Sequence, residues 1–196
     1  MLFQAGYSIL APDSRGHGSS EGPLVTYGIL EKFDTLIWAD WMKKEGCQKI
    51  YGLGESLGGA VLIQAAAERP VFSAIIAECS YEDLLSVAKD RIGRGDQFTA
   101  LPIQGILIGG ALYAKTRYGL DLRQASPVQS ARSLKTPLFL IHGLNDTETL
   151  PRHSQAIHQA APGSELWLVP NARHVGAYVA QPAKFEIRIL DWLKQF

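Results

Sequence analysis

Short apolar runs alternate with helical patterns along most of the chain, and this alternation predicts an α/β fold. Runs of this kind, bounded by turn residues, are typical of buried strands. Four of them are residues 50–53, 73–77, 137–141 and 165–169, and three are followed by a helical pattern. A fifth run, residues 7–11, ends at Pro12 and predicts one more buried strand.

Two helices are predicted clearly by the spacing of apolar residues. In residues 26–44, apolar side chains recur near helical spacing with charged residues between them, and Gly46 follows the end. Residues 57–68 are small and apolar, as in a packed helix. The expected architecture is therefore a mostly parallel sheet with helices on both faces. Chemistry is expected at the carboxyl ends of the strands.

We expect one domain, residues 1–196, because neither a linker nor an internal repeat is visible. Residues 81–126 interrupt the alternation with two helix-like pieces and predict a small helical cap inserted into that domain. The segment 100–113 is largely apolar. It is suited either to lining an apolar pocket or to packing as an ordinary cap helix on the rim of the sheet.

Composition argues against several classes of binding partner and cofactor. The 19 basic and 19 acidic residues balance, and no basic cluster attracts nucleic acid or anionic membranes. Cys47 and Cys79 have no metal-binding spacing, so we expect reduced packing thiols and neither a metal nor an organic cofactor. Residues 1–6 lack the features of a signal peptide or a membrane span, which favours a cytoplasmic location.

The segment 54–58, Gly-Glu-Ser-Leu-Gly, is the strongest chemical signal in the chain. A serine at a sharp turn from strand to helix is typical of a nucleophile elbow, which exposes the hydroxyl to a base and to backbone N–H groups. We expect Gly54 and Gly58 to permit the tight turn because neither carries a side chain. The alternative is that Ser56 only caps the following helix.

Candidates for the acid and the base follow in chain order. Asp146 lies after the run 137–141, and His174 lies after the run 165–169, so both are expected at the same edge of the sheet as Ser56. A buried carboxylate there orients an imidazole. Two alternatives stay open: Glu78 for the acid and His142 for the base, although His142 is better suited to ordering the acid loop.

Four motifs carry a resemblance to a known family. Residues 12–20, 54–59, 142–146 and 173–176 resemble, in order, the arginine-glycine loop, elbow, acid loop and histidine loop of the α/β-hydrolase superfamily, in its monoglyceride-lipase and serine-aminopeptidase-like branch. The resemblance implies that Ser56 is the nucleophile, Asp146 the orienting acid and His174 the general base and then acid. It also implies that the Leu57 N–H is one oxyanion donor.

The chain departs from that family at its beginning. Strands one to three of the family, and the loop that supplies a second oxyanion donor, have no counterpart, so the fold is expected to be truncated at the N-terminus. The run 7–11 is expected either to pair directly with 50–53 or to leave open sheet edges that favour a homo-oligomer. A truncated gene model is the third possibility. Losing one oxyanion donor costs about a hundred- to a thousandfold in turnover, which predicts a slow enzyme.

The resulting hypothesis is a serine-dependent, carboxylesterase-like hydrolase that cleaves a small-molecule ester through an acyl-enzyme on Ser56. The alternatives are a peptidase or amidase of the same fold, and a non-catalytic fragment that binds a ligand or partner with an inert triad. Arg15 is expected to bind loop carbonyls rather than an anionic substrate. Three further histidines are expected on loops or helix surfaces: His17, His153 and His158.

Overall fold

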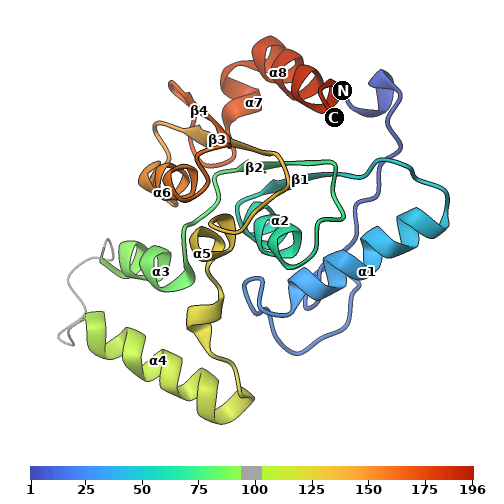
Figure 1. Cartoon of the computed structure of the whole chain (residues 1–196). Helices are drawn as coiled ribbons and strands as arrows, with labels where there is room; N and C mark the ends of the chain where they lie inside the picture. The colour runs from blue at the N-terminus through green and yellow to red at the C-terminus, as the bar shows by residue number, and fades with distance from the viewer. Residues whose placement is uncertain (94–102) are drawn as a thin grey trace.

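A computed structural model of the protein describes residues 1–93 and 103–196 and contains a four-stranded parallel sheet (Figure 1). The strands lie side by side in the order β1-β2-β3-β4. They are β1 (Tyr51–Glu55), β2 (Ala74–Glu78), β3 (Leu138–Gly143) and β4 (Glu165–Val169). These are the four runs that the apolar pattern predicted, and the α/β class with a parallel sheet is confirmed.

Helices connect the strands and follow the sheet. They are α1 (Glu31–Lys44), α2 (Leu57–Glu68), α3 (Leu84–Gly93), α4 (Ile103–Tyr118), α5 (Pro127–Ala131), α6 (Arg152–Ala160), α7 (Ala177–Ala180) and α8 (Pro182–Lys194). Two short 3-10 helices are η1 (Phe3–Ala5) and η2 (Leu122–Gln124). Helix α2 spans the predicted residues. Helix α1 begins at Glu31 rather than at residue 26, because the Glu31 carboxylate accepts the N–H groups of Thr26 and Gly28 and holds that segment in a turn.

Helices pack on both faces of the sheet, and successive strand residues point into opposite layers. Ile75 and Leu140 contribute to one core with α2 and α6, whereas Ile76 and Phe139 contribute to the other with α8 (Figure 1). Every residue of β2 and β3 is buried, as expected for central parallel strands.

The prediction of a strand at residues 7–11 is wrong. The segment has no strand structure and is largely exposed, with Ile9 at 59%. Tyr7 packs edge-to-face on Tyr51, at 5.9 Å between ring centroids, but no backbone ladder forms. The following loop is fixed to α1 by an ion pair of Arg15 with Asp34. Within residues 1–93 and 103–196, no strand pairs with the outer edge of β1.

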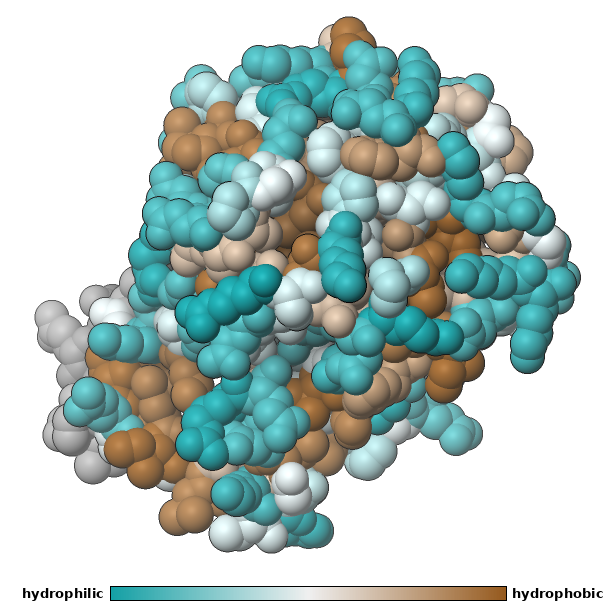
Figure 2. All heavy atoms as spheres, in the orientation of Figure 1, coloured by the Kyte–Doolittle hydropathy of each residue, from teal (hydrophilic) through white to brown (hydrophobic). Residues whose placement is uncertain are grey.

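Helices α3 and α4 lie in the connection between β2 and β3, where the cap was predicted (Figure 1). Helix α4 packs on α3 and has no buried residue. Figure 2 shows apolar atoms gathered over α4, where Ile108, Leu112 and Tyr113 are exposed. Part of the apolar segment 100–113, residues 100–102, lies outside the described residues. None of the described helices is both long and apolar enough to cross a bilayer.

Candidate active site

Ser56 occupies a strained turn between β1 and α2. Its φ of 50° and ψ of −112° lie outside the helical and extended regions, a conformation that costs free energy and persists only where the surroundings impose it. The Ser56 N–H donates to the carbonyl of Glu78 at 2.7 Å, which fixes the turn to the end of β2. Leu57 is the first residue of α2, so its N–H has no acceptor within the helix.

Gly54 and Gly59, rather than Gly54 and Gly58, make the tight turn possible. A β-carbon on Gly54 would lie 2.5 Å from the carbonyl carbon of Gly58, and one on Gly59 would overlap Ser80 Oγ. A β-carbon on Gly58 would meet nothing within 4 Å. The expected role of Gly58 is therefore corrected: Gly58 faces open space, and Gly59 lies in close contact with Ser80, which follows β2, and with the Gly54 carbonyl.

The three predicted side chains form one hydrogen-bonded chain. His174 Nε2 lies 3.0 Å from Ser56 Oγ, although the two residues are 118 positions apart. His174 Nδ1 lies 2.7 Å from Asp146 Oδ2. The imidazole is thus placed between a hydroxyl and a carboxylate, with Nδ1–H donating to the carboxylate and Nε2 free to accept from the hydroxyl.

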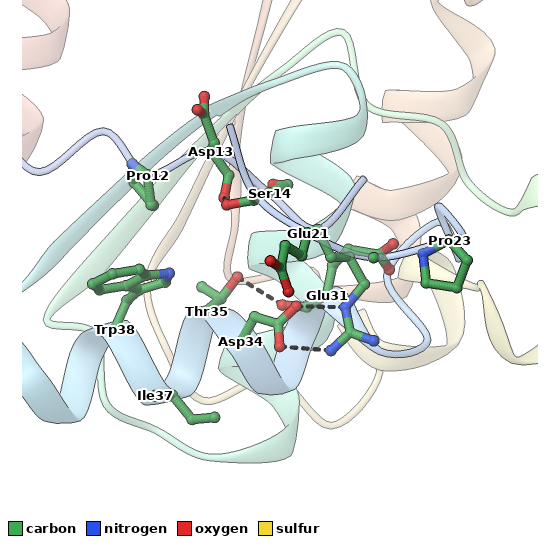
Figure 3. A pocket seen from close by; sticks show the side chains of 13 residues that line it. Pro12, Asp13, Ser14, Glu21, Pro23, Glu31, Asp34, Thr35, Ile37 and Trp38 are labelled. Atoms are coloured by element: carbon green, nitrogen blue, oxygen red, sulfur yellow. Dashed lines mark hydrogen bonds and ion pairs between the residues drawn. The ribbon is translucent and has the colours of Figure 1, made fainter. Parts of the chain in front are cut away.

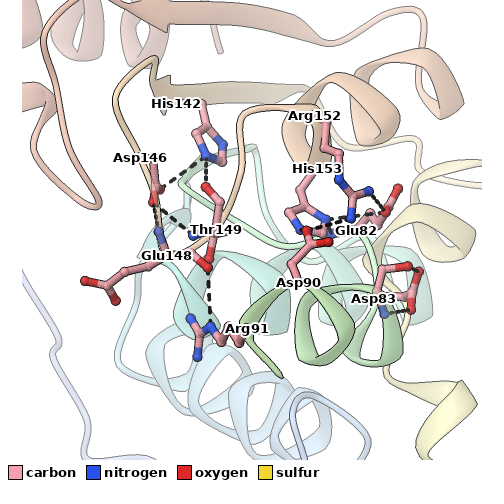
Figure 4. A network of polar contacts seen from close by, with 11 residues as sticks. Glu82, Asp83, Asp90, Arg91, His142, Asp146, Glu148, Thr149, Arg152 and His153 are labelled. Carbon is pink, nitrogen blue, oxygen red and sulfur yellow. Dashed lines mark hydrogen bonds and ion pairs between the residues drawn. The ribbon is translucent and has the colours of Figure 1, made fainter. Parts of the chain in front are cut away.

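Asp146 is 2% exposed and every side of its carboxylate is occupied (Figure 4). Oδ1 accepts the N–H groups of Glu148 and Thr149 at 2.8 and 2.9 Å, and Oδ2 accepts from His174. Burial opposes ionisation of this carboxyl. Hydrogen bonds from His142, His174 and the Thr149 N–H outweigh that effect and hold the pKa of Asp146 well below its usual range.

Asp146 in turn shifts the pKa of the His174 imidazole. The hydrogen bond to Asp146 raises the pKa of His174 above its ordinary value, although partial burial opposes the rise. The negative charge of Asp146 and that of Glu148 act in the same direction. His174 therefore holds a proton more strongly than a free histidine does.

His142 orders the acid loop. It is fully buried, with Nε2 at 2.8 Å from the Thr149 carbonyl and Nδ1 at 2.6 Å from Ser154 Oγ. Nε2 also lies 3.3 Å from Asp146 Oδ2 (Figure 4). The ring thus connects β3, the acid loop and α6. It lies against the carboxylate, and His174 is the histidine that contacts Ser56.

Glu78, the alternative acid, lies at the end of β2 and is 4% exposed. One carboxyl oxygen accepts the Ala177 N–H at 3.0 Å, and no hydrogen bond joins it to His174. Burial raises the pKa of Glu78, and the charge of Glu55 adds to the rise. Asp146 rather than Glu78 is therefore the carboxylate that contacts the imidazole.

Cys79, His142 and Asp146 place potential metal ligands within 4.8 Å of one another. Burial raises the pKa of Cys79 to about 12, so its sulfur is a thiol rather than the thiolate that binds metals. Both His142 nitrogens and the Asp146 oxygens already have partners. These three residues fit a hydrogen-bonded support for the site better than a metal centre.

A cavity of about 300 Å³ opens beside Ser56 and Leu57. Its other lining residues come from the loop before α1, the connection between β2 and α3, and α3 itself: Tyr27, Tyr81, Leu84, Val87, Ala88, Arg91 and Ile92. The Tyr81 hydroxyl donates to the Tyr27 carbonyl at 3.1 Å, which joins two of these walls. No described residue of α4 lines the cavity, so the apolar segment at 103–113 does not supply its wall.

A second hollow, of about 610 Å³, lies between the loop 12–23 and α1 (Figure 3). Arg15 lies there and pairs with both oxygens of Asp34, at 2.5 and 2.6 Å. The prediction that Arg15 binds loop carbonyls is therefore wrong, because its partner is the carboxylate of Asp34 on α1. Ser56 does not line this hollow, which separates it from the candidate site.

His153 is not on a helix surface as predicted. It is fully buried, and its Nε2 lies 3.1 Å from Asp90 Oδ2. Arg152 bridges Glu82 and Asp90 at 2.6 Å to each (Figure 4). This network ties α6 to α3, the helix that walls the cavity. The two carboxylates that Arg152 binds lie 70 and 62 positions before it in the chain, so no local pattern predicts the network.

Residues 2–186 of the chain match the model of a family described as the alpha/beta hydrolase family. The chain belongs to the α/β-hydrolase family. A comparison with curated proteins gave no match. Among solved structures, the Pyrococcus furiosus esterase Pf2001 is 26% identical with a TM-score of 0.76, over 100% of this chain and 73% of that one.

More distant α/β structures share the fold. A puromycin-hydrolyzing peptidase of Mycobacterium tuberculosis is 20% identical with a TM-score of 0.58, over 76% of this chain and 22% of that one. An acylaminoacyl peptidase of Pyrococcus horikoshii is 20% identical with a TM-score of 0.55, over 79% and 25%. Family membership and the esterase neighbour together support a hydrolase role for this α/β-hydrolase chain.

Proposed function

We propose that the protein hydrolyses carboxylic esters through an acyl-enzyme on Ser56. The observation that carries the proposal is the chain of two contacts from Ser56 Oγ to His174 Nε2 and from His174 Nδ1 to Asp146, at 3.0 and 2.7 Å. A hydroxyl is a weak nucleophile until a base takes its proton, and this arrangement supplies that base. The likeness to an esterase at 26% identity favours an ester over an amide.

In the first half of the reaction, Ser56 Oγ attacks the carbonyl carbon while its proton passes to His174 Nε2. Asp146 keeps the Nδ1 proton in place and stabilises the imidazolium that forms. The Leu57 N–H at the start of α2 donates to the developing oxyanion, helped by the positive end of the helix. The tetrahedral intermediate collapses as the imidazolium protonates the departing alkoxide, which leaves as the alcohol.

In the second half, water attacks the acyl carbon and gives its proton to His174. Ser56 Oγ then leaves with that proton, and the carboxylic acid is released. The reaction consumes only water and the ester, and His174 Nε2 accepts and then donates the proton in each half. With Leu57 as the one oxyanion donor assigned, turnover is expected about a hundred- to a thousandfold below that of a site with two donors.

A fluorophosphonate probe tests this function without knowledge of the natural ester. Such probes react with activated serines, so the wild-type chain should be labelled, and peptide mass mapping should place the label on Ser56. Ser56→Ala should remain unlabelled at the same circular dichroism signal. His174→Ala should label far more slowly. A folded wild-type chain that never labels would support a non-catalytic binding fragment instead.

A further inference from the structure

Among the described residues that line the cavity beside Ser56, Arg91 is the charged one. Most of the wall contributed by α3 is apolar, from Leu84, Val87 and Ile92. Arg91 lies on the same helix and lines the same cavity. In a largely apolar pocket, the apolar wall binds the bulk of a ligand, and a small number of polar or charged groups set its orientation.

Among the described residues, the Arg91 side chain makes one hydrogen bond. Its Nε donates to the backbone carbonyl of Glu148 at 3.4 Å, so the side chain reaches from α3 to the acid loop (Figure 4). In residues 1–93 and 103–196 Arg91 forms no ion pair, with Glu148 or with any other described carboxylate. The carboxylate of the neighbouring residue Asp90 already interacts with Arg152 and His153.

Electrostatic effects place this charge near the reacting groups. The hydrogen bond to Asp146 raises the pKa of His174, and the positive charge of Arg91 acts against that rise. Burial raises the pKa of Tyr81, and Arg91 again acts in the opposite direction. Arg91 therefore lies within electrostatic range of both the imidazole and a tyrosine of the cavity wall.

We propose that Arg91 binds a carboxylate at the far end of the acyl chain, so that the preferred substrates are monoesters of dicarboxylic acids. The inference rests on the proposed ester hydrolysis. A guanidinium presents paired N–H groups that match the two oxygens of a carboxylate, and the apolar residues of α3 suit the methylene groups between the two ends. Hydrolysis consumes water and gives an alcohol and a dicarboxylate.

Matched esters test the preference. p-Nitrophenyl hydrogen adipate and hydrogen suberate carry the carboxylate, whereas p-nitrophenyl hexanoate and octanoate have the same acyl lengths without it. All four release the same phenol, and enzyme-free blanks correct for self-hydrolysis. A charge-assisted hydrogen bond predicts that kcat/KM for the better acidic ester exceeds that of its neutral partner by about ten- to a hundredfold. Added salt should reduce the ratio.

Variants assign the preference to one side chain. Arg91→Gln should remove the ratio, with the neutral esters hydrolysed by the same variant as the internal reference, and Arg91→Lys should restore only part of it. Lys89→Gln is the matched control, because Lys89 is an exposed cation of α3 that does not line the cavity. It should leave the ratio unchanged. Equal kcat/KM for acidic and neutral esters in the wild type would overturn the inference while leaving ester hydrolysis intact.

A binding measurement separates this inference from the catalytic one. Ser56→Ala cannot form an acyl-enzyme, so calorimetric titration with monomethyl suberate measures recognition alone. Binding that weakens about tenfold or more in Ser56→Ala/Arg91→Gln would support the inference even if the wild-type chain hydrolysed no ester. Equal binding by Ser56→Ala and by the double variant would overturn it.

Discussion

Gly143 lies directly against the backbone of Ala172, so closely that a β-carbon at position 143 would overlap the Ala172 carbonyl oxygen. The acid loop also donates two backbone hydrogen bonds: the Leu144 N–H donates to the carbonyl of Val169, at the end of β4, at 2.9 Å, and the Asn145 N–H donates to the carbonyl of Ala172 at 2.9 Å. The acid loop and the histidine loop are therefore held together by backbone contacts. The 2.7 Å contact of Asp146 with His174 depends on that close approach.

Gly143→Ala should separate the two loops. The added methyl group has to displace backbone rather than a flexible side chain, so we expect a loss of about 1–3 kcal/mol in the free energy of unfolding. A displacement of about 1 Å at the imidazole is expected to lower kcat/KM by about a hundredfold. Urea denaturation and ester kinetics measure both effects. Gly163→Ala is the control, since a β-carbon there meets nothing within 4 Å, and equal effects of the two substitutions would contradict this account.

The glycines of the elbow predict a second contrast. Gly54→Ala places a methyl group 2.5 Å from the first turn of α2, so the variant should lose most activity and fold less stably. Gly58→Ala faces open space in a helix and should retain activity, with stability unchanged or raised by up to about 1 kcal/mol. Thermal unfolding and labelling by the fluorophosphonate probe distinguish the two variants. Loss of labelling in Gly58→Ala at an unchanged fold would show that the contrast is wrong.

The raised pKa of His174 predicts the pH dependence of activity. Only the neutral imidazole accepts the Ser56 proton, so kcat/KM should fall as pH falls through the pKa of His174. Because the hydrogen bond to Asp146 raises that pKa, the midpoint should lie above the ordinary value of 6.5.

Asp146→Asn checks this assignment. Without the negative charge, the midpoint should move to lower pH, and the maximal kcat should fall by about ten-thousandfold. Glu78→Gln is the comparison, because Glu78 accepts a hydrogen bond from Ala177 rather than from His174. This variant should leave the pH midpoint unchanged and the maximal kcat within a few-fold of wild type. If the midpoint stayed the same in Asp146→Asn, or moved instead in Glu78→Gln, the assignment of Asp146 as the acid would be wrong.

The open edge of β1 predicts self-association. Leu53 on this strand is 41% exposed, and no described strand pairs with the outer edge. Unpaired strand edges favour pairing between copies, and a net charge of zero provides little repulsion. Light scattering after size exclusion should show a mass that rises with concentration.

A charged residue at that edge should reduce the association. Leu53→Lys is expected to shift the protein toward monomer, whereas Ile187→Lys, at an exposed position of α8, should not. A wild-type mass equal to one chain at every concentration would count against the prediction.

Strands β2 and β3 could be predicted from sequence because they are buried on both faces and read as continuous apolar runs. Residues 7–11 show the limit of that signal. The run is as apolar as a strand, but strand formation also needs a neighbouring edge in register, which no local pattern encodes. Ile9 is 59% exposed as a result.

The residues around Ser56 show a similar division. Motif and chain order predicted that Ser56, Asp146 and His174 lie at one edge of the sheet, because each follows a recognisable strand, and the three side chains contact one another. The burial of His153 and the ion pair of Arg15 with Asp34 depend on contacts between segments distant in sequence. Local spacing therefore predicted the wrong exposure for His153 and the wrong partner for Arg15. Likewise, only the packing of α2 on β2 distinguishes Gly59 from Gly58.

Hydrolysis of p-nitrophenyl acetate and butyrate by the 196-residue chain, measured beside Ser56→Ala of equal fold, tests whether Ser56 is the nucleophile. We expect slow but measurable release of p-nitrophenol by the wild type, and a rate for Ser56→Ala indistinguishable from the enzyme-free blank. Equal rates for the two proteins would contradict the assignment of Ser56 as the nucleophile.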